Sequence, residues 1–333
     1  MNSVFCYNLN MAKTIVGVLR GGPSSEYEVS LQTGASVLKN LNRERYEPRD
    51  IFITKNGVWH MDGFQRGEDY ILHRLDVVFN ALHGEYGEDG KVQRILEHFG
   101  VPFTGSRSLP SAMAMNKVMT KNSMVNLPLK MPRHIVIENS DEDLEKKIME
   151  IWRTFIQPSV VKPMALGSSV GVGIARDFPT LHGLILGALE KSDAALVEEY
   201  IRGREATCGV VENFRGDEIY QLLPVEIIPP AEKDFFDYEA KYSGASREIC
   251  PGNFLPEEKV AIQQAAALVH QTLGLGHYSR SDFIVSPKRG IYFLEVNTLP
   301  GLTNESLLPK SLAAIGCSLP DFLEHLITLA LSR

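Results

Sequence analysis

The chain has 333 residues, too many for one ordinary hydrophobic core, and so predicts two or three domains. Its net charge of −7, from 34 basic and 41 acidic residues, offers no field for nucleic acid. No apolar run reaches the roughly 18 residues that cross a bilayer. The first dozen residues lack the basic start and apolar centre of a secretory signal, so we expect no contact with a membrane.

Cysteine usage points to a reducing compartment. The four cysteines are scattered, without the spacing of a metal or redox site. Reduced thiols in a cytoplasmic enzyme are the natural interpretation. The residues are Cys6, Cys208, Cys250 and Cys317.

The N-terminal third alternates strand-like and helix-like patterns. Residues 1–12 are expected to be a disordered extension, with translation starting at Met1 or at Met11. The alternation, with short glycine turns, predicts an open parallel sheet in an α/β domain over residues 1–110. The expected strands are 14–19, 48–54, 76–84 and a short edge strand 101–105, and the expected helices are 29–41 and 90–100.

Two polar turns follow strands of this predicted sheet. They read "GGPSSEYE" over residues 21–28 and "HGEYGEDG" over residues 83–90. Ligands bind open α/β sheets at the carboxyl ends of the strands, so both turns are candidates for a ligand site. Glu28, in the first turn of the predicted helix, sits where a small ammonium-bearing ligand would bind. A carboxylate that favours the helix dipole is the simpler alternative for Glu28.

Two further units follow, a central one over residues 111–202 and a C-terminal one over residues 203–333. The stretch 229–251 contains three prolines and little periodicity. A loop of this length in a compact domain is usually functional, and we expect a lid that is mobile without ligand. The remaining expected elements are helices 108–129, 141–155, 257–273 and one ending near Leu331, and strands 132–137, 159–163, 195–201, 205–212, 218–228, 281–286 and 290–297.

The strongest constellation of chemical groups is "RSDFIVSPKRGIYFLEVN", which reads as a two-stranded hairpin. Glu295 and Asn297 are two apart on one strand and therefore share a face. An antiparallel partner brings Asp282 beside them. Two carboxylates and an amide oxygen are ligands that Mg²⁺ takes beside nucleotide phosphates. Solvated polar residues on an edge strand are the alternative, but "FLEVN" embeds its polar pair in an apolar run, where a carboxylate needs a cation.

A second constellation is "VVKPMALGSSVGVGIA", residues 160–175. In a phosphate-binding loop of the usual kind, the lysine follows the glycines and opens a helix. Here Lys162 comes first and the glycines turn back into another apolar run, which predicts a strand–loop–strand hairpin. Backbone N–H groups of a glycine-rich hairpin approach a phosphate closely, and Lys162 adds a mobile charge.

Several further residues are weaker candidates. Arg280 lies near the proposed metal ligands, where a permanent cation suits an oxyanion or a phosphate. Gly301 offers a backbone N–H. Ser306 begins a short helix whose N-terminus would accept a carboxylate, and a plain N-cap is an equal alternative. Glu198 and Glu205 would accept hydrogen bonds from an adenine amine and from ribose hydroxyls, respectively. For these two residues and for Lys117, an ordinary solvated side chain is the alternative.

Seven motifs in order resemble the D-alanine–D-alanine ligase family of the ATP-grasp superfamily, over nearly the whole chain. The resemblance implies a three-domain ATP-grasp architecture with ATP and two Mg²⁺ (or Mn²⁺) between the second and third domains. The motifs are "GGPSSEYEVS", "HGEYGEDG", "VVKPMALGSSVGVGIA", "LVEEYIRGRE", "FFDYEAKYS", "RSDF" and "EVNTLPGLTNESLLP".

Carried over motif by motif, the resemblance implies a role for each candidate. The hairpin after Lys162 closes over the triphosphate. The implied nucleotide contacts are Lys117 and Lys162 on phosphates, Lys241 on the γ-phosphate, Glu198 and Ile201 on adenine, and Glu205 on ribose. The implied metal ligands are Asp282, Glu295 and Asn297. The implied substrate and catalytic residues are Glu28 and His83 for the first D-alanine, Ser168 linking Glu28 to Tyr242, Arg280 and Gly301 at the oxyanion, and Ser306 and Leu307 for the second carboxylate.

In the family mechanism, the carboxylate of one D-alanine attacks the γ-phosphorus of ATP. The amine of a second D-alanine then attacks the resulting acyl phosphate, for peptidoglycan precursor synthesis. A homodimer is expected by analogy. Glu85 and Glu199 depart from the commonest family residues. Tyr242 favours a dipeptide over D-lactate as acceptor, D-serine stays open, and a catalytically silent nucleotide-binding regulator is a further alternative.

Overall fold

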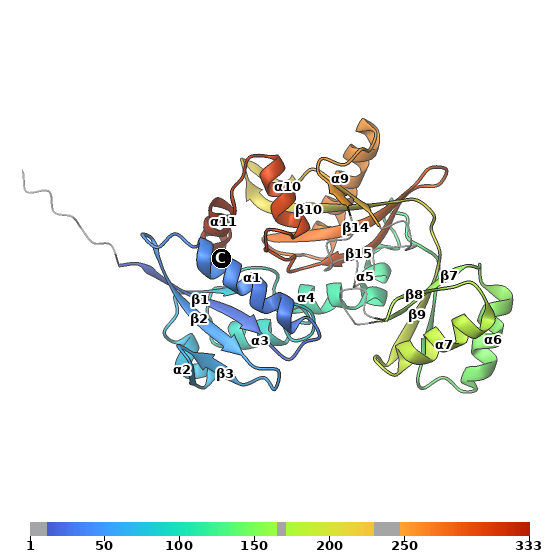
Figure 1. Cartoon of the computed structure of the whole chain (residues 1–333), viewed down its shortest axis with the longest axis horizontal. Coiled ribbons are helices and arrows are strands. Elements are labelled where there is room, and N and C mark those ends of the chain that lie inside the picture. Colours follow the sequence, from blue (N-terminus) through green and yellow to red (C-terminus); the bar gives the residue numbers. More distant parts are fainter. Residues whose placement is uncertain (1–11, 165–170, 230–246) are drawn as a thin grey trace, which may run out of the picture.

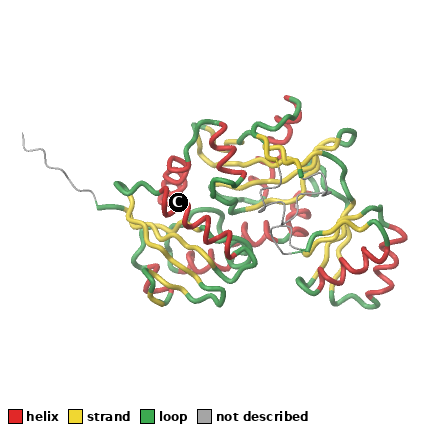
Figure 2. Tube along the Cα trace, in the orientation of Figure 1, coloured by secondary structure: helices red, strands yellow, loops and turns green. Residues whose placement is uncertain are grey.

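The computed structural model describes residues 12–164, 171–229 and 247–333. Three groups of strands stand apart along the molecule (Figures 1 and 2). The predicted sites Ser168, Lys241 and Tyr242, residues 1–11 of the predicted extension and most of the predicted lid lie outside the described residues.

The N-terminal domain contains a five-stranded sheet in the order β4-β3-β2-β1-β5. β1 is parallel to β2 and β5, as the alternating pattern predicts, whereas β3 and β4 add an antiparallel hairpin at one edge. The predicted edge strand 101–105 is wrong, because Phe103 makes only an isolated parallel bridge to Val78. The elements are β1 (Thr14–Gly21), β2 (Tyr46–Ile53), β3 (Trp59–Met61), β4 (Phe64–Gln65), β5 (Val77–Asn80), α1 (Tyr27–Asn40), α2 (Glu68–Leu72) and α3 (Lys91–His98).

The central domain is a four-stranded antiparallel sheet in the order β6-β9-β7-β8, with α6 and α7 packed on it. β7 and β8 pair antiparallel, so the strand–loop–strand hairpin predicted around the Gly/Ser loop is confirmed. Asp177 caps α7 by accepting a hydrogen bond from the Thr180 N–H at 2.8 Å. The elements are β6 (His134–Glu138), β7 (Ser159–Pro163), β8 (Gly173–Ala175), β9 (Ala194–Glu199), α6 (Leu144–Thr154) and α7 (Phe178–Leu189).

The C-terminal domain is a six-stranded antiparallel sheet in the order β13-β12-β10-β14-β15, with β11 paired to β10. The single strand predicted over 218–228 is wrong. It is two strands, β11 and β12, separated just before Val225 by Pro224, which has no N–H for a ladder. The elements are β10 (Arg204–Phe214), β11 (Asp217–Gln221), β12 (Val225–Ile228), β13 (Arg247–Ile249), β14 (Tyr278–Ser286), β15 (Gly290–Asn297), α9 (Pro256–Thr272), α10 (Leu307–Ala314) and α11 (Leu319–Leu331).

The helix predicted over 108–129 is two helices, α4 (Ser108–Met115) and α5 (Lys117–Met124). Asn116 breaks it with an extended backbone, and its side chain accepts the Val118 and Met119 N–H groups at 3.1 and 3.0 Å. By the predicted boundary after residue 110, α5 and most of α4 belong to the central unit. Ala114 and Met124 nevertheless pack in the core of the C-terminal sheet, so α5 lies where the two units meet.

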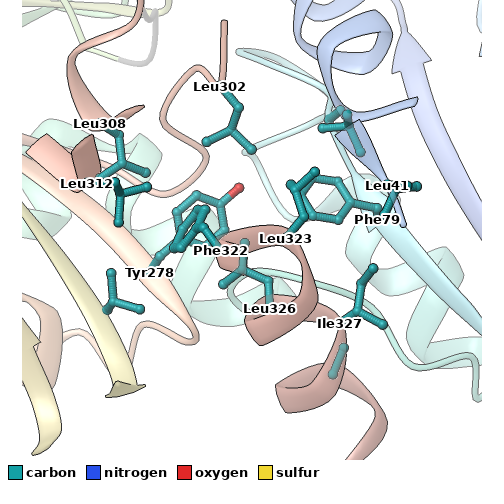
Figure 3. Close-up of a cluster of buried hydrophobic side chains, with 14 of the residues drawn as sticks. Leu41, Phe79, Tyr278, Leu302, Leu308, Leu312, Phe322, Leu323, Leu326 and Ile327 are labelled. Atoms are coloured by element: carbon teal, nitrogen blue, oxygen red, sulfur yellow. The ribbon is translucent and has the colours of Figure 1, made fainter. Parts of the chain in front are cut away.

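Helix α11 joins the C-terminal and N-terminal domains (Figure 3). Phe322 packs edge-on against Tyr278, with ring centroids 5.7 Å apart, in a cluster that also contains Leu41 and Phe79 of the N-terminal domain. The N-terminal domain and the last helix of the chain therefore share one hydrophobic core. Among the described residues, no single helix is long and apolar enough to cross a membrane, and only the sharply bent pair α10 and α11 passes that test jointly.

Candidate active site

A cleft opens between the central and C-terminal sheets. It is lined by β7, β8 and β9 on one side and by β10, β14 and β15 on the other. These two sheets are neighbours in the molecule (Figure 1). Its lining combines an apolar part with charged side chains. The apolar residues include Val160, Ile174, Ile201, Ile284 and Leu294, and the charged residues include Lys162, Glu198, Glu205, Arg280, Asp282 and Glu295.

The apolar part of the cleft is a slot between the two sheets. Ile201, predicted to contact adenine, packs with Ile284, Tyr292 and Leu294 in a small cluster that connects the sheets. Glu205, predicted to contact ribose, lines the same cleft from β10. An apolar slot flanked by carboxylates suits a flat heterocycle that carries an amine and hydroxyl groups.

Glu198 is the most buried charged group of the cleft, with 2% of its side chain exposed. Lys162 Nζ lies 2.6 Å from one carboxylate oxygen, and Lys121 Nζ lies 2.7 Å from the other. Burial alone would raise the pKa of Glu198, but the two lysines hold it below its usual value. Burial opposes the charge of Lys162 too, yet Glu198 and Glu295 together raise its pKa. Sequence reasoning missed Lys121, since one helix lysine looks like another.

Lys117 begins α5 and points toward the acidic part of the cleft. Its Nζ lies 3.6 Å from a carboxylate oxygen of Glu295, and its side chain is 9% exposed. Burial lowers its pKa, while Glu295 acts in the opposite direction. The solvated helix lysine that sequence reasoning offered as an alternative is therefore wrong.

The three predicted metal ligands come together on β14 and β15. Asp282 stands directly opposite Glu295, and Asn297 opposite Arg280. The register shifts between Asp282 and Phe283, and this bulge lets the adjacent residues Leu294 and Glu295 both line the cleft. The hairpin thus supplies an apolar side chain and a carboxylate at neighbouring positions.

The donor groups on this hairpin fit a hard divalent cation. Asp282 accepts hydrogen bonds from Arg280 Nε at 3.0 Å, Arg280 Nη2 at 3.1 Å and Thr207 Oγ1 at 2.6 Å. Asn297 Oδ1 accepts the Leu299 N–H at 2.9 Å, which fixes the amide. Among the described residues, no group of three or more His, Cys, Asp or Glu gathers as in an all-protein metal site. Two carboxylates and an amide suit Mg²⁺, which also keeps phosphate and water ligands.

The turn over residues 83–90 closes one side of the site from the N-terminal domain. His83 is buried, and its Nε2 lies 2.8 Å from Thr33 Oγ1. Burial, with a smaller contribution from the charge of Arg280, lowers the pKa of His83 to about 4. The imidazole of His83 is therefore uncharged near neutral pH, within the electrostatic influence of Arg280.

Glu88 ties this turn to the C-terminal domain. One carboxylate oxygen accepts the Thr298 and Leu299 N–H groups at 3.2 and 3.1 Å, directly after the strand that carries Asn297. Burial and the charge of Glu26 raise the pKa of Glu88 to about 7. Sequence reasoning did not single out Glu88, although it lies in a turn that was recognised.

The structure separates Glu28 from the other candidate residues. Its side chain is 74% exposed and lies 3.9 Å from Lys55 Nζ. Glu26 is instead buried, and a Cβ added to Gly84 would lie 2.8 Å from its carboxylate oxygen. Helical periodicity could have found this difference, because the buried face of α1 contains Ser30, Thr33, Gly34 and Val37, and position 26 continues it by four residues.

Gly301, Ser306 and Leu307 lie around the start of α10. Ser306 Oγ accepts a hydrogen bond from the Thr303 N–H at 3.2 Å and makes none to the first turn of α10. The hydroxyl of Ser306 therefore does not act as a plain N-cap. A Cβ on Gly301 would lie 2.7 Å from Ser306 Oγ, so a larger residue there would displace this hydroxyl. Leu307 lines the cleft.

The two residues that depart from the family's commonest forms each hold elements together. Glu85 Oε2 accepts hydrogen bonds from Ser24 Oγ at 3.0 Å and the Ser25 N–H at 3.2 Å, which joins the two polar turns of the N-terminal domain. Glu199 is buried and accepts from Arg289 Nη2 at 3.0 Å, which links β9 to the turn between β14 and β15.

Comparison with known proteins decides the family. The model of the D-ala D-ala ligase N-terminus matches residues 15–71 and 60–106, and that of the D-ala D-ala ligase C-terminus matches residues 123–328. The chain belongs to the D-alanine–D-alanine ligase family. A D-alanine–D-alanine ligase of Syntrophobacter fumaroxidans is 38% identical over 97% of this chain and 99% of its own length.

Solved structures of ligases share the fold, so the predicted ATP-grasp architecture is confirmed. VanG D-Ala:D-Ser ligase from Enterococcus faecalis is 30% identical with a TM-score of 0.82, over 96% of this chain and 100% of its own. D-alanine–D-alanine ligase from Bacillus anthracis complexed with ATP is 32% identical with a TM-score of 0.76, over 96% of this chain and 98% of its own.

Proposed function

We propose that this chain uses ATP to join two molecules of D-alanine into D-alanyl-D-alanine, a precursor of the cell wall. The observation that carries the proposal is the cleft between the two sheets of an ATP-grasp fold. There the buried Lys162–Glu198 pair and the acidic pair Asp282–Glu295 face one cavity. Membership of the ligase family supplies the reaction.

The nucleotide would lie along this cleft. The slot around Ile201 suits adenine, with Glu198 accepting a hydrogen bond from its amine and Glu205 from ribose hydroxyls. Lys117 and Lys162 would bind the phosphates, because Lys117 is buried beside Glu295 and Lys162 lines the same cleft as the acidic hairpin. Lys241, from outside the described residues, would add a third cation at the γ-phosphate.

Asp282, Glu295 and Asn297 would hold two Mg²⁺ or Mn²⁺ ions. Bound metal would neutralise the phosphate charge and favour attack on the γ-phosphorus. The protein positions its own groups for this, since Arg280 and Thr207 fix the carboxylate of Asp282.

The substrates would meet beside Arg280. Glu26, in place of the predicted Glu28, would bind the ammonium of the first D-alanine, because Glu26 is buried next to the turn of His83. Ser306 and Leu307 would bind the second carboxylate at the start of α10. Ser168 and Tyr242 would complete the first site in the way that the family resemblance implies.

The reaction would proceed in two displacements. A carboxylate oxygen of the first D-alanine attacks the γ-phosphorus, which releases ADP and leaves an acyl phosphate. The amine of the second D-alanine then attacks the carbonyl, loses a proton and expels phosphate. Arg280 and the Gly301 N–H would stabilise the oxyanion of the tetrahedral intermediate. Positioning and charge neutralisation carry most of this catalysis.

We place this enzyme in the cytoplasm. The described cysteines, Cys208, Cys250 and Cys317, are free thiols, which suits a cytoplasmic protein. We also propose a homodimer, by analogy with the family. Light scattering that gives the mass of one chain at micromolar concentration would contradict the dimer.

Phosphate release from ATP and Mg²⁺ tests the function, with D-alanine, D-serine, D-lactate and L-alanine in parallel and products identified by mass. The proposal predicts release with D-alanine alone and a D-alanyl dipeptide as product. Release only after D-serine or D-lactate is added would change the acceptor, in line with the D-Ala:D-Ser neighbour. Binding of ATP without any release would favour the silent regulator.

A further inference from the structure

Lys121 lies directly beneath the proposed nucleotide site. Its side chain is 1% exposed, yet its Nζ lies 2.7 Å from Glu198 Oε1. Lys162 Nζ lies 2.6 Å from Glu198 Oε2. One buried carboxylate thus has a separate lysine on each of its two oxygens. A single cation would already compensate its charge.

The two lysines differ in their freedom to move. Lys162 stands on β7 and lines the cleft, so its ammonium can turn toward an anion there. Lys121 stands on α5 and is not part of the cleft lining. Met124, one turn further along α5, packs in the core of the C-terminal sheet and fixes the helix. Lys121 therefore has Glu198 as its ion-pair partner whether or not the cleft is filled.

The charge of Glu198 explains the need for two lysines. A buried carboxylate without a cation costs several kcal/mol, so a single lysine partner could not leave it for a phosphate. We propose that Lys121 is a positioning residue, the permanent counter-ion of Glu198, and that it frees Lys162 to bind nucleotide phosphates. This proposal rests on the nucleotide site proposed above and adds a residue to it.

Loss of Lys121 should therefore act through Lys162. In Lys121→Met, Lys162 becomes the only cation on Glu198 and stays there, so its contact with phosphate is lost. Adenosine, which has no phosphate, should bind as before. A merely structural role of Lys121 would weaken the binding of ATP and of adenosine together.

Calorimetric binding of ATP and of adenosine, without D-alanine, separates these cases. Losing one charged hydrogen bond corresponds to at least about a 10-fold loss of affinity. We expect Lys121→Met to lose that much for ATP and less than about 2-fold for adenosine. The control is Lys147→Met, which removes a lysine of the same domain whose Nζ pairs with Asp141 at 2.6 Å on the surface. It should change neither affinity.

Two further variants show whether a loss in Lys121→Met comes from poor folding or from Lys162. In a Lys162→Met/Glu198→Gln background, adding Lys121→Met should cause no further loss for ATP, because the carboxylate is neutralised and the residue that Lys121 acts through is gone. In Lys121→Met/Glu198→Gln the carboxylate no longer retains Lys162, so the ratio of ATP to adenosine affinity should return to that of Glu198→Gln alone.

The outcomes separate this inference from the proposed function. Equal losses for ATP and adenosine in Lys121→Met, or a full additional loss in the Lys162→Met/Glu198→Gln background, would overturn the role of Lys121 and leave the nucleotide site intact. A wild-type chain that binds neither ATP nor adenosine would instead contradict the proposed function, and the inference would fall with it.

Discussion

Asp282 and Glu295 stand directly opposite each other on β14 and β15, and each carboxylate has a cation beside it. Arg280 donates to Asp282 at 3.0 Å, and Lys117 lies 3.6 Å from Glu295. The acidic pair is therefore held in place before any metal arrives. It marks where the phosphates and the attacking carboxylate would meet.

Removing the charge of Asp282 should strongly slow metal-dependent turnover. We expect Asp282→Asn to lower kcat for phosphate release at least about 100-fold, because the developing charge on the phosphate loses its metal. Titration of Mn²⁺ in the presence of ADP should show weaker metal binding. Asp217→Asn, an exposed change on β11 of the same sheet, serves as the control. Unchanged Mn²⁺ affinity in Asp282→Asn would contradict the assignment.

Glu26 and Glu28 form a matched pair for the first substrate site. Glu26→Gln removes a buried charge beside Gly84 and should raise KM for D-alanine at least about 10-fold, since an ammonium loses its charged partner. Glu28→Gln changes a side chain exposed to solvent and should leave KM within about 2-fold. Steady-state kinetics of phosphate release measures both. The reverse order of effects would restore Glu28 as the substrate residue.

Glu88 should make stability fall as pH rises through the neutral range. Its pKa is raised from 4.5 to about 7, so the folded state binds its proton more tightly than the unfolded state does. That contribution is complete below pH 4.5 and is lost as pH rises to 7, with a magnitude on the order of 3 kcal/mol.

The comparison that isolates this effect is wild type against Glu88→Gln, by urea unfolding between pH 4.5 and 7.5. His83, whose pKa is lowered to about 4, gives a slope of opposite sign, and it cancels when the two curves are subtracted. The free energy of unfolding of wild type should decline relative to the variant across this window. A flat difference would mean that Glu88 has an ordinary pKa.

The core shared by α11 and the N-terminal domain should dominate stability. Phe322 is fully buried against Tyr278 in the cluster of Figure 3. Phe322→Ala should lower the free energy of unfolding by about 3–5 kcal/mol. Phe64→Ala, at a position 64% exposed, should cost far less. If Phe322→Ala and Phe64→Ala had equal midpoints in thermal unfolding, this core would be shown to contribute little to stability.

Sequence patterns anticipated the parts of the site that depend on local order. The antiparallel hairpin around Asp282 and Glu295 was predicted from two apolar runs and a turn, and the register places both residues opposite each other. The hairpin of β7 and β8 followed from the position of Lys162 before the glycines. Both depend on strand periodicity and turn residues, which act over a few positions.

The residues that were missed depend on long-range packing. Lys121 looks like any solvated helix lysine until α5 is placed under β9. Glu88 acquires its role from backbone N–H groups 210 and 211 positions away. The contact of α11 with the N-terminal sheet likewise joins the two ends of the folded chain, and no local pattern encodes such a partner.

The central claim is that a carboxylate of D-alanine is activated as an acyl phosphate in this cleft. It is tested by D-alanine labelled with ¹⁸O in its carboxylate, followed by mass analysis of the released phosphate. Attack on the γ-phosphorus transfers one labelled oxygen, which stays with the phosphate when the second amine displaces it. The account predicts one ¹⁸O in each phosphate for every dipeptide formed. Unlabelled phosphate released together with dipeptide would contradict it.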